Sequence, residues 1–165
     1  MTGQQWEKIG ILLVCMGNLC RSPTAQAVLL DKAAEAGLKT QLLIESAGTH
    51  VSHTGDPPDE RARRAAAKRG YDMSWSRTRR VRDDDFLRFD YVLAMDENNL
   101  LNLAKNCPAE HAEKLALFMS YGSAGMAQSV PDPYYGGPQG FERVLDMVED
   151  AAQGLLRHIR SRHNL

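Results

Sequence analysis

Short, nearly unbroken apolar runs alternate along this chain with longer segments in which apolar residues recur at helical spacing. The first run, Ile9 to Val14, is rich in β-forming residues and is typical of a strand buried on both faces of a parallel sheet. Three later segments also predict strands: Gln41 to Ala47, Asp90 to Met95 and Lys114 to Met119. The pattern therefore predicts four strands.

Helical periodicity fills the intervals between these runs. After the first run, apolar residues recur from Ala25 to Ala36, just before Gly37, which favours a helix that stops at this glycine. Further helical segments are expected at Pro58 to Arg69, Glu97 to Asn106 and, as a short turn, Asp83 to Arg88. The clearest stripe runs from Phe141 to Ile159 and predicts a long helix that covers the sheet.

Strands and helices in alternation predict an α/β fold. The chain has 165 residues, 43% of them hydrophobic, and no repeat or interdomain linker divides it, so we predict a single domain over residues 1–165. Ligands of open α/β sheets usually bind at the carboxyl ends of the strands. The loop that begins at Cys15 and the turn that contains Asp132 each follow a predicted strand, so both are expected at that edge.

Charge and cysteine content limit the binding partners and the cellular compartment to be expected. Twenty basic and 21 acidic residues leave a net charge of −1, which gives no reason to expect nucleic acid or an anionic membrane as partner. The run from Ile9 to Cys15 is too short for a signal core or a membrane span, so no membrane insertion is expected. The three cysteines, Cys15, Cys20 and Cys107, are too few for a disulfide scaffold and favour a reducing compartment, the cytoplasm.

The segment from Cys15 to Pro23 carries the clearest chemistry. It places a thiol at the end of the first predicted strand and the Arg21 guanidinium six positions later, where a helix begins. Amides of a loop that curls into a helix N-terminus form an anion-sized concavity, and the helix dipole adds positive potential, so a dianionic phosphoryl group fits there. The loop residues expected to contact it are Met16, Gly17, Asn18, Leu19, Cys20 and Ser22.

The same field predicts a nucleophile. A thiol at a helix N-terminus beside a cation has a depressed pKa, so Cys15 is expected to react as a thiolate at neutral pH. Arg21 offers a planar fork that binds two phosphoryl oxygens at once, which a lysine does less well. Gly17 and Asn18 tolerate the left-handed backbone conformations that a tight loop needs.

Two interpretations of Ser22 stay open. Before Pro23, it fits a helix N-cap followed by proline at the first helical position. Alternatively, its hydroxyl donates to the sulfur of Cys15 and stabilises the thiolate. A nucleotide-binding P-loop is excluded, because that loop requires Gly-Lys-Ser or Gly-Lys-Thr where Cys20-Arg21-Ser22 stands.

With these residues the sequence resembles the low-molecular-weight protein tyrosine phosphatases, whose signature is a cysteine, five residues and an arginine, with Gly-Asn inside and Ser-Pro after it. The similarity continues in the family's order through Ser46 to Thr49, Pro57 to Asp59, Phe89 to Asp96 and Asp132 to Gly136. It implies a flavodoxin-like, four-stranded parallel sheet flanked by helices on both faces. It also implies hydrolysis of phosphotyrosine in proteins through a cysteinyl phosphate, without cofactor or metal, by a monomer or weak dimer.

The resemblance assigns further roles. Asp132, held between two prolines, matches the family's general acid. Tyr134 and Tyr135 match aromatic residues that line one wall of the substrate cleft. Asn18 and Ser46 match residues that hold the phosphate loop in shape by hydrogen bonds.

Cys20 matches a second loop cysteine that can form a reversible disulfide with Cys15, although a small packing residue is an equally open interpretation. Two positions depart from the family. Ser52 stands where many members have Trp or Tyr on the opposite wall of the cleft, which removes one stacking surface for an aryl phosphate. Arg69 stands where some members have a loop-supporting histidine, and we interpret it as a solvated helix residue.

Particular residues distinguish a tyrosine phosphatase from three alternative functions. An arsenate reductase on the same loop needs two further cysteines on a later segment, where only Cys107 is present. A protein-arginine phosphatase typically has threonine at the position of Leu19. A non-catalytic anion-binding or redox module has no use for Asp132.

Two other groups of residues were weighed as binding sites. His50 and His53 lack the spacing of zinc ligands, so we expect no metal site. The basic stretch Arg77 to Arg82 precedes three aspartates and is interpreted as a solvated, self-compensating surface. Recruitment of an acidic partner is the alternative.

Overall fold

The computed structural model describes residues 7–165, so the first six residues of the domain expected over 1–165 lie outside it. In this part of the chain, four parallel strands form one sheet in the order β2-β1-β3-β4. The strands are β1 (Ile9–Cys15), β2 (Leu42–Gly48), β3 (Tyr91–Ala94) and β4 (Leu115–Leu117). The predicted four-stranded parallel sheet is confirmed.

Five α-helices and three 3₁₀ turns complete the described chain. The α-helices are α1 (Arg21–Glu35), α2 (Glu60–Lys68), α3 (Asp83–Arg88), α4 (Glu97–Asn106) and α5 (Pro138–Arg162). The 3₁₀ turns are η2 (Lys39–Gln41), η3 (Ala109–Lys114) and η4 (Phe118–Tyr121). No helix among residues 7–165 combines the length and apolar character needed to cross a bilayer.

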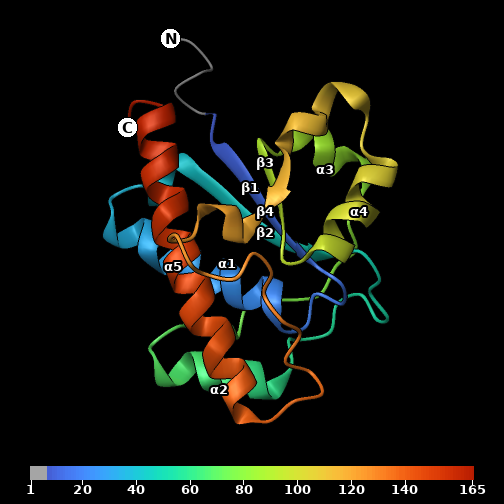
Figure 1. The fold of residues 1–165 in the computed structure, drawn as a ribbon, viewed down its shortest axis with the longest axis vertical. Coiled ribbons are helices and arrows are strands. Elements are labelled where there is room, and N and C mark those ends of the chain that lie inside the picture. Colours follow the sequence, from blue (N-terminus) through green and yellow to red (C-terminus); the bar gives the residue numbers. More distant parts are fainter. Residues whose placement is uncertain (1–6) are drawn as a thin grey trace.

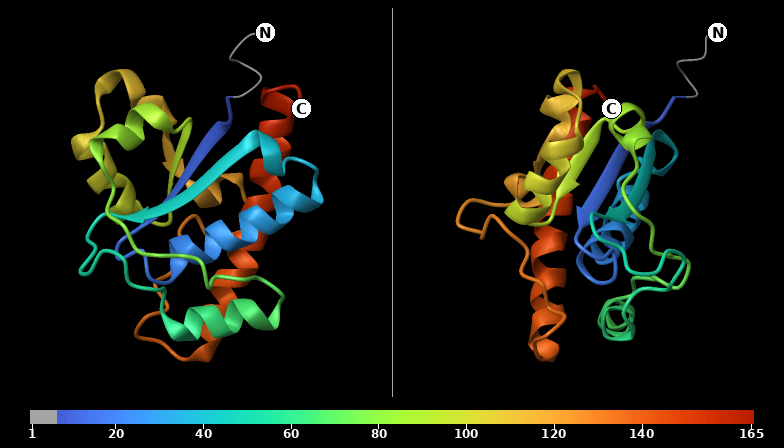
Figure 2. Two further views of the ribbon diagram at one scale, coloured as in Figure 1. Left: turned by 180° about the vertical axis from the view of Figure 1, so that it is seen from behind. Right: turned by 90° about the vertical axis from the view of Figure 1, so that its right-hand side faces the viewer.

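Consecutive residues of β1 point to opposite faces of the sheet. Ile11 and Leu13 join the core formed with α1, α2 and α5, whereas Leu12 and Val14 join the core formed with α3 and α4. Figure 1 and the left view of Figure 2 show α1 and α5 side by side, with α3 and α4 gathered elsewhere around the sheet. The expected helical layers on both faces are therefore present.

The bounds differ from the sequence expectation at the edge strand and at α2. β4 has a single neighbour, β3, and only three of its residues pair with it. The flanking residues, expected to extend this strand, form the turns η3 and η4 instead. Helix α2 begins at Glu60 and not at Pro58, because Asp59 caps it by accepting a hydrogen bond from the backbone N–H of Arg61 at 2.8 Å.

The connections after β1 and before α5 converge at one edge of the sheet. β1 lies between β2 and β3, so it marks the point where the strand order reverses, and the loop after it is the usual ligand position of such sheets. The long connection over residues 122–137 passes the N-terminal end of α1 on its way to α5 (Figure 1). Asp132 is thereby brought to the Cys15 loop.

Candidate active site

The loop between β1 and α1 wraps around the sulfur of Cys15. The backbone N–H of Asn18 donates to this sulfur at 3.2 Å, and the hydroxyl of Ser22 lies 3.0 Å from it. Asn18 has a φ of 58°, in the left-handed region that asparagine tolerates better than most residues. Gly17 does not adopt a positive φ, so of these two residues only Asn18 makes the left-handed turn.

The side chain of Asn18 connects this loop to its surroundings. Its amide nitrogen donates to the hydroxyls of Ser22 at 2.8 Å and Ser46 at 3.0 Å, and its oxygen accepts from the backbone N–H of Arg79 at 3.0 Å. Ser46 in turn donates to Gln26 at 2.7 Å. Asn18 and Ser46 thus make contacts of the kind expected of loop supports. No local sequence signal indicated Gln26 or Arg79, since both reach the loop through the tertiary fold.

Ser22 does not cap the helix, so that interpretation is wrong. Helix α1 begins at Arg21 with Cys20 in the N-cap position, and no side chain caps it. The Ser22 oxygen already accepts a hydrogen from Asn18, so its own hydrogen is available to the Cys15 sulfur at 3.0 Å, which is closer than the carbonyl oxygen of Ala47 at 3.4 Å. A thiolate can only accept, so Ser22 is the donor in that state.

Arg21 is buried, with 4% of its side chain exposed, and is anchored on one edge. Its Nη1 donates to Asp96 at 2.6 Å and to the carbonyl oxygen of Val130 at 3.0 Å. The other oxygen of Asp96 accepts from the backbone N–H of Asn99 and so caps α4. Asp96 ends the family-like segment Phe89 to Asp96, but the sequence did not indicate what it does. Its carboxylate orients the guanidinium.

The Cys15 loop opens into a cavity of about 240 Å³. The cavity is lined by loop residues, residues after β2 and residues of the turn before α5: Cys15, Met16, Gly17, Leu19, Cys20, Arg21, His50, Ser52, Asp132, Tyr134 and Tyr135. All three expected catalytic residues are in this set. Asn18, Ser22 and Ser46 do not line the cavity and lie buried behind its wall. His50, considered from sequence only as a metal ligand, is an additional lining residue.

Asp132 is positioned by its own turn. One carboxylate oxygen accepts from the backbone N–H of Tyr134 at 3.0 Å, and the other lies 3.8 Å from Nη2 of Arg21. The ring of Tyr134 packs edge-on against that of Tyr135, with centroids 4.9 Å apart, and the Arg61 guanidinium lies 5.3 Å from the Tyr134 centroid. One wall of the cavity is therefore aromatic.

Cys20 shares the cavity but differs from Cys15 in its surroundings. Burial raises the pKa of the Cys20 thiol to about 12, and the negative charge of Asp59 nearby adds to the shift. Cys20 therefore stays protonated at neutral pH. A protonated thiol is a weak nucleophile, so Cys20 competes poorly with Cys15 for an electrophile in this cavity.

The interpretation of Arg69 as a solvated residue is wrong. Its guanidinium binds three carboxylates of α5, from Glu142 at 2.8 Å, Asp146 at 2.9 Å and Glu149 at 3.0 Å. The pKa of Arg69 is raised above its ordinary value because the favourable effect of these carboxylates outweighs the opposing effect of desolvation. Arg69 joins the end of α2 to α5 and does not line the cavity.

Comparison with known proteins finds this chain similar to one family of phosphatases. The sequence profile of the family described as low molecular weight phosphotyrosine protein phosphatase matches residues 10–164. The protein of that name from Schizosaccharomyces pombe is 38% identical over 154 residues, covering 93% of this chain and 98% of the relative. A low molecular weight protein-tyrosine-phosphatase of Streptomyces coelicolor is 41% identical over 153 residues, covering 91% and 93%.

The fold agrees with that similarity. The crystal structure of a protein tyrosine phosphatase from Entamoeba histolytica superimposes with a TM-score of 0.90 at 37% sequence identity. The match covers 96% of this chain and 100% of the other.

Proposed function

This chain belongs to the low molecular weight phosphotyrosine protein phosphatase family, and we propose that it hydrolyses phosphotyrosine in proteins with Cys15 as nucleophile, Arg21 as phosphoryl-binding cation and Asp132 as proton donor. The observation that carries these roles is the single cavity that all three side chains line. Asp132 comes from a turn far from the other two residues in sequence. Folding alone gives no reason to bring a thiol, a guanidinium and a carboxylate from two separate parts of the chain into one cavity.

In the first step, the Cys15 sulfur attacks phosphorus as a thiolate. The S–P bond forms while the bond between phosphorus and the tyrosyl oxygen breaks, and Asp132 gives its proton to that oxygen. The N–H of Asn18 and the hydroxyl of Ser22 stabilise the sulfur anion. The edge of Arg21 that Asp96 and Val130 leave free binds phosphoryl oxygens as their charge spreads.

In the second step, the carboxylate of Asp132 takes a proton from water while the water oxygen attacks phosphorus. The S–P bond breaks, inorganic phosphate leaves, and Cys15 is again a thiolate. The sum is one water consumed and one phosphate released, with the tyrosine hydroxyl restored. Every proton in this scheme moves through Asp132, so the scheme needs no cofactor.

The walls of the cavity set the substrate class. Tyr134 and Tyr135 offer aromatic faces to a tyrosyl ring, while Met16 and Leu19 add apolar surface at the mouth. Ser52 provides no stacking surface on its side, so affinity for aryl phosphates depends on the Tyr134 side.

Cys20 has a separate proposed role. When Cys15 is oxidised to a sulfenic acid, the Cys20 thiol displaces its hydroxyl as water, and a disulfide forms. Both thiols are free and line the same cavity. Reduction restores Cys15, so the disulfide protects the nucleophile from irreversible oxidation.

The rival activities find less support. Cys107 packs with the α3 and α4 core and does not line the cavity, so a three-thiol arsenate reductase relay is incomplete. Leu19 at the cavity favours the tyrosine branch over arginine phosphatases. We further propose that the partner is a phosphotyrosine-containing protein and that the enzyme acts as a monomer or weak dimer. A cytoplasmic location is proposed because the three cysteines are free thiols, as a reducing compartment allows.

The test is a rapid-quench experiment combined with a substrate panel. With 4-nitrophenyl phosphate, we expect a burst of nitrophenolate equal to the enzyme concentration, and none from Cys15→Ser. Phosphotyrosine peptides should be hydrolysed in preference to phosphoserine and phosphoarginine peptides, and arsenate should not be reduced. Unchanged turnover by Cys15→Ser removes the nucleophile from the scheme, and a preference for phosphoarginine reassigns the substrate.

A further inference from the structure

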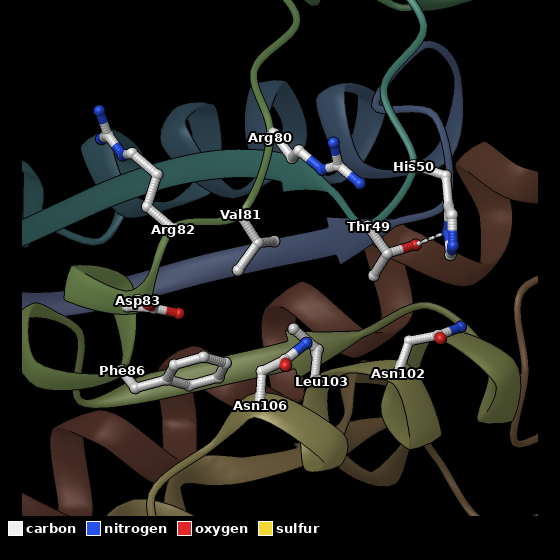
Figure 3. Close-up of a pocket in the computed structure, with 10 residues that line it drawn as sticks. All are labelled: Thr49, His50, Arg80, Val81, Arg82, Asp83, Phe86, Asn102, Leu103 and Asn106. Carbon is white, nitrogen blue, oxygen red and sulfur yellow. Dashed lines mark hydrogen bonds between the residues drawn. The ribbon is translucent and has the colours of Figure 1, made fainter.

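A second cavity of about 180 Å³ adjoins the active-site cavity, and His50 lines both. Figure 3 shows the segment over residues 80–83 on one side of it and α4 on the other, with Thr49 and His50 at one end. Val81, Phe86 and Leu103 give it an apolar lining. Nothing in the proposed reaction uses this cavity.

The basic stretch over residues 77–82 divides into occupied and unoccupied cations. Arg77 donates to two backbone carbonyl oxygens, and Arg79 binds two side-chain carboxylates. Within residues 7–165, the guanidinium groups of Arg80 and Arg82 make neither an ion pair nor a hydrogen bond, and both residues line the second cavity. The expectation of a self-compensating surface therefore holds for only part of the stretch.

The backbone holds Arg80 at a fixed place. Arg80 forms an isolated parallel bridge with Gly48 at the end of β2. The N–H of Gly48 donates to Arg79 and the N–H of Val81 donates to Gly48, both at 2.9 Å. The base of the Arg80 side chain is thus attached to the sheet.

Two hydrogen bonds join this region to the catalytic loop. The N–H of Thr49 donates to the carbonyl oxygen of Cys15 at 3.0 Å, and the N–H of His50 donates to that of Met16 at 2.8 Å. The end wall of the second cavity is therefore built directly on the loop that binds phosphate. A peptide seated with its phosphotyrosine at Cys15 has this cavity as a neighbour.

The charged groups are arranged so that positive charge faces the active site. In Figure 3, Arg80 extends toward His50, whereas Asp83 lies at the opposite end beside Phe86 and Arg82 extends away. The carboxylate of Asp83 therefore does not neutralise Arg80. The end of the cavity nearest the active site presents an unpaired guanidinium beside an imidazole, above an apolar lining.

We propose that this cavity is a subsite for one acidic side chain, Asp or Glu, of the protein substrate, an inference that rests on the proposed function. Arg80 binds the carboxylate through its guanidinium fork, and Val81 contacts the methylene groups of the acidic side chain. The contact lies away from the reacting atoms and is the same in the ground and transition states. It lowers KM and leaves kcat unchanged.

Phosphotyrosine peptides that carry a single Glu, or a matched Gln, at successive positions on either side of the phosphotyrosine test the subsite. At one position, we expect kcat/KM for the Glu peptide to exceed that for the Gln peptide about fivefold through KM, the range of a partly exposed ion pair. Arg80→Gln should abolish this preference and leave hydrolysis of phenyl phosphate unchanged. Arg77→Gln, with the same loss of charge on the same stretch but outside the cavity, should retain it.

Reversal of the charge gives a sharper result. Arg80→Glu should prefer Lys over Gln at the position where the native enzyme prefers Glu. Equal kcat/KM for every Glu and Gln pair in the native enzyme overturns the subsite, as does an equal loss in Arg77→Gln, which indicates a diffuse charge effect. The phenyl phosphate reaction separates the two proposals, because its failure in the native enzyme rejects the phosphatase mechanism and not the subsite.

Discussion

The two halves of the active site are held in place in different ways. In the loop after β1, Cys15, Asn18 and Ser22 are each at most 2% exposed, and hydrogen bonds connect them to one another and to α1 and β2. In the turn before α5, the side chain of Asp132 is 38% exposed and Tyr135 is 92% exposed. The hydrogen bond that Asp132 accepts comes from its own turn.

This difference matches the two tasks. A sulfur anion and a phosphoryl group gain most from donors that are fixed before the reaction, because such donors need no reorganisation. A proton donor must reach the oxygen of whichever tyrosine enters, so a turn anchored at its ends suits it. Val130 provides one anchor by donating to Met95 at 2.8 Å, and α5 provides the other. The predictions below compare the buried loop with the exposed turn.

The largest effect is expected from Arg21→Lys. A lysine can keep the contact with Asp96 but has no second edge for the phosphoryl oxygens, so kcat/KM should fall about a thousandfold, at the upper end for loss of a preorganised donor. Steady-state kinetics with 4-nitrophenyl phosphate measure it. Arg64→Lys, a change at an exposed arginine of α2 paired with Glu60, is the control and should stay within about twofold. A loss below tenfold in Arg21→Lys assigns phosphate binding to the loop amides alone.

Asp132→Asn should act on chemistry without affecting the fold. Asparagine keeps the acceptor for Tyr134 but carries no transferable proton, so kcat/KM, which reports the first step and not the hydrolysis of the cysteinyl phosphate, should fall about a hundredfold with phenyl phosphate. With 4-nitrophenyl phosphate, whose leaving group needs little protonation, the loss should be much smaller. A thermal melt should show no change, because the side chain is partly exposed. Equal losses with the two substrates contradict the acid role.

A matched pair of glycine substitutions compares the two regions directly. A Cβ at Gly48 meets the carbonyl oxygen of Met16 at 2.6 Å, so Gly48→Ala should push the phosphate loop outward, lower stability by about 1–3 kcal/mol and lower kcat about tenfold. A Cβ at Gly136 meets only Pro133, at 3.8 Å, so Gly136→Ala should change stability by less than about 0.5 kcal/mol. Chemical denaturation and steady-state kinetics of both variants measure these effects. Equal destabilisation contradicts the comparison.

The sequence pattern alone predicted the catalytic residues of the buried loop, but not the one on the exposed turn. The nucleophile and Arg21 are close in sequence, so a strand, a loop and a helix start were sufficient to place them. Asp132 needed the family motif, because a carboxylate between prolines is by itself an ordinary turn. Strand and helix patterns predicted the sheet, except at β4, where an edge strand with one neighbour ends as soon as pairing stops.

The supporting contacts were beyond local patterns. Asp96 lies 75 residues from Arg21, and Ser46 lies 28 residues from Asn18, so only the fold brings each pair together. The capping interpretation of Ser22 failed for a related reason. Nearby residues favour a cap, but the sulfur and Asn18 compete successfully for its hydroxyl. Tertiary hydrogen bonding decided the orientation of each of these side chains.

The smallest effect concerns the wall opposite the tyrosines. Ser52 lines the cavity without a ring, so Ser52→Trp should add a stacking surface and lower KM for phenyl phosphate about threefold, within the range of one aromatic pair. Because the added contact is present before and during the reaction, kcat should stay unchanged. Thr54→Trp, which adds the same ring nearby but outside the cavity, is the control. If both variants lower KM alike, the gain comes from general surface hydrophobicity. If neither does, the exposed Tyr134 side alone holds the aryl ring.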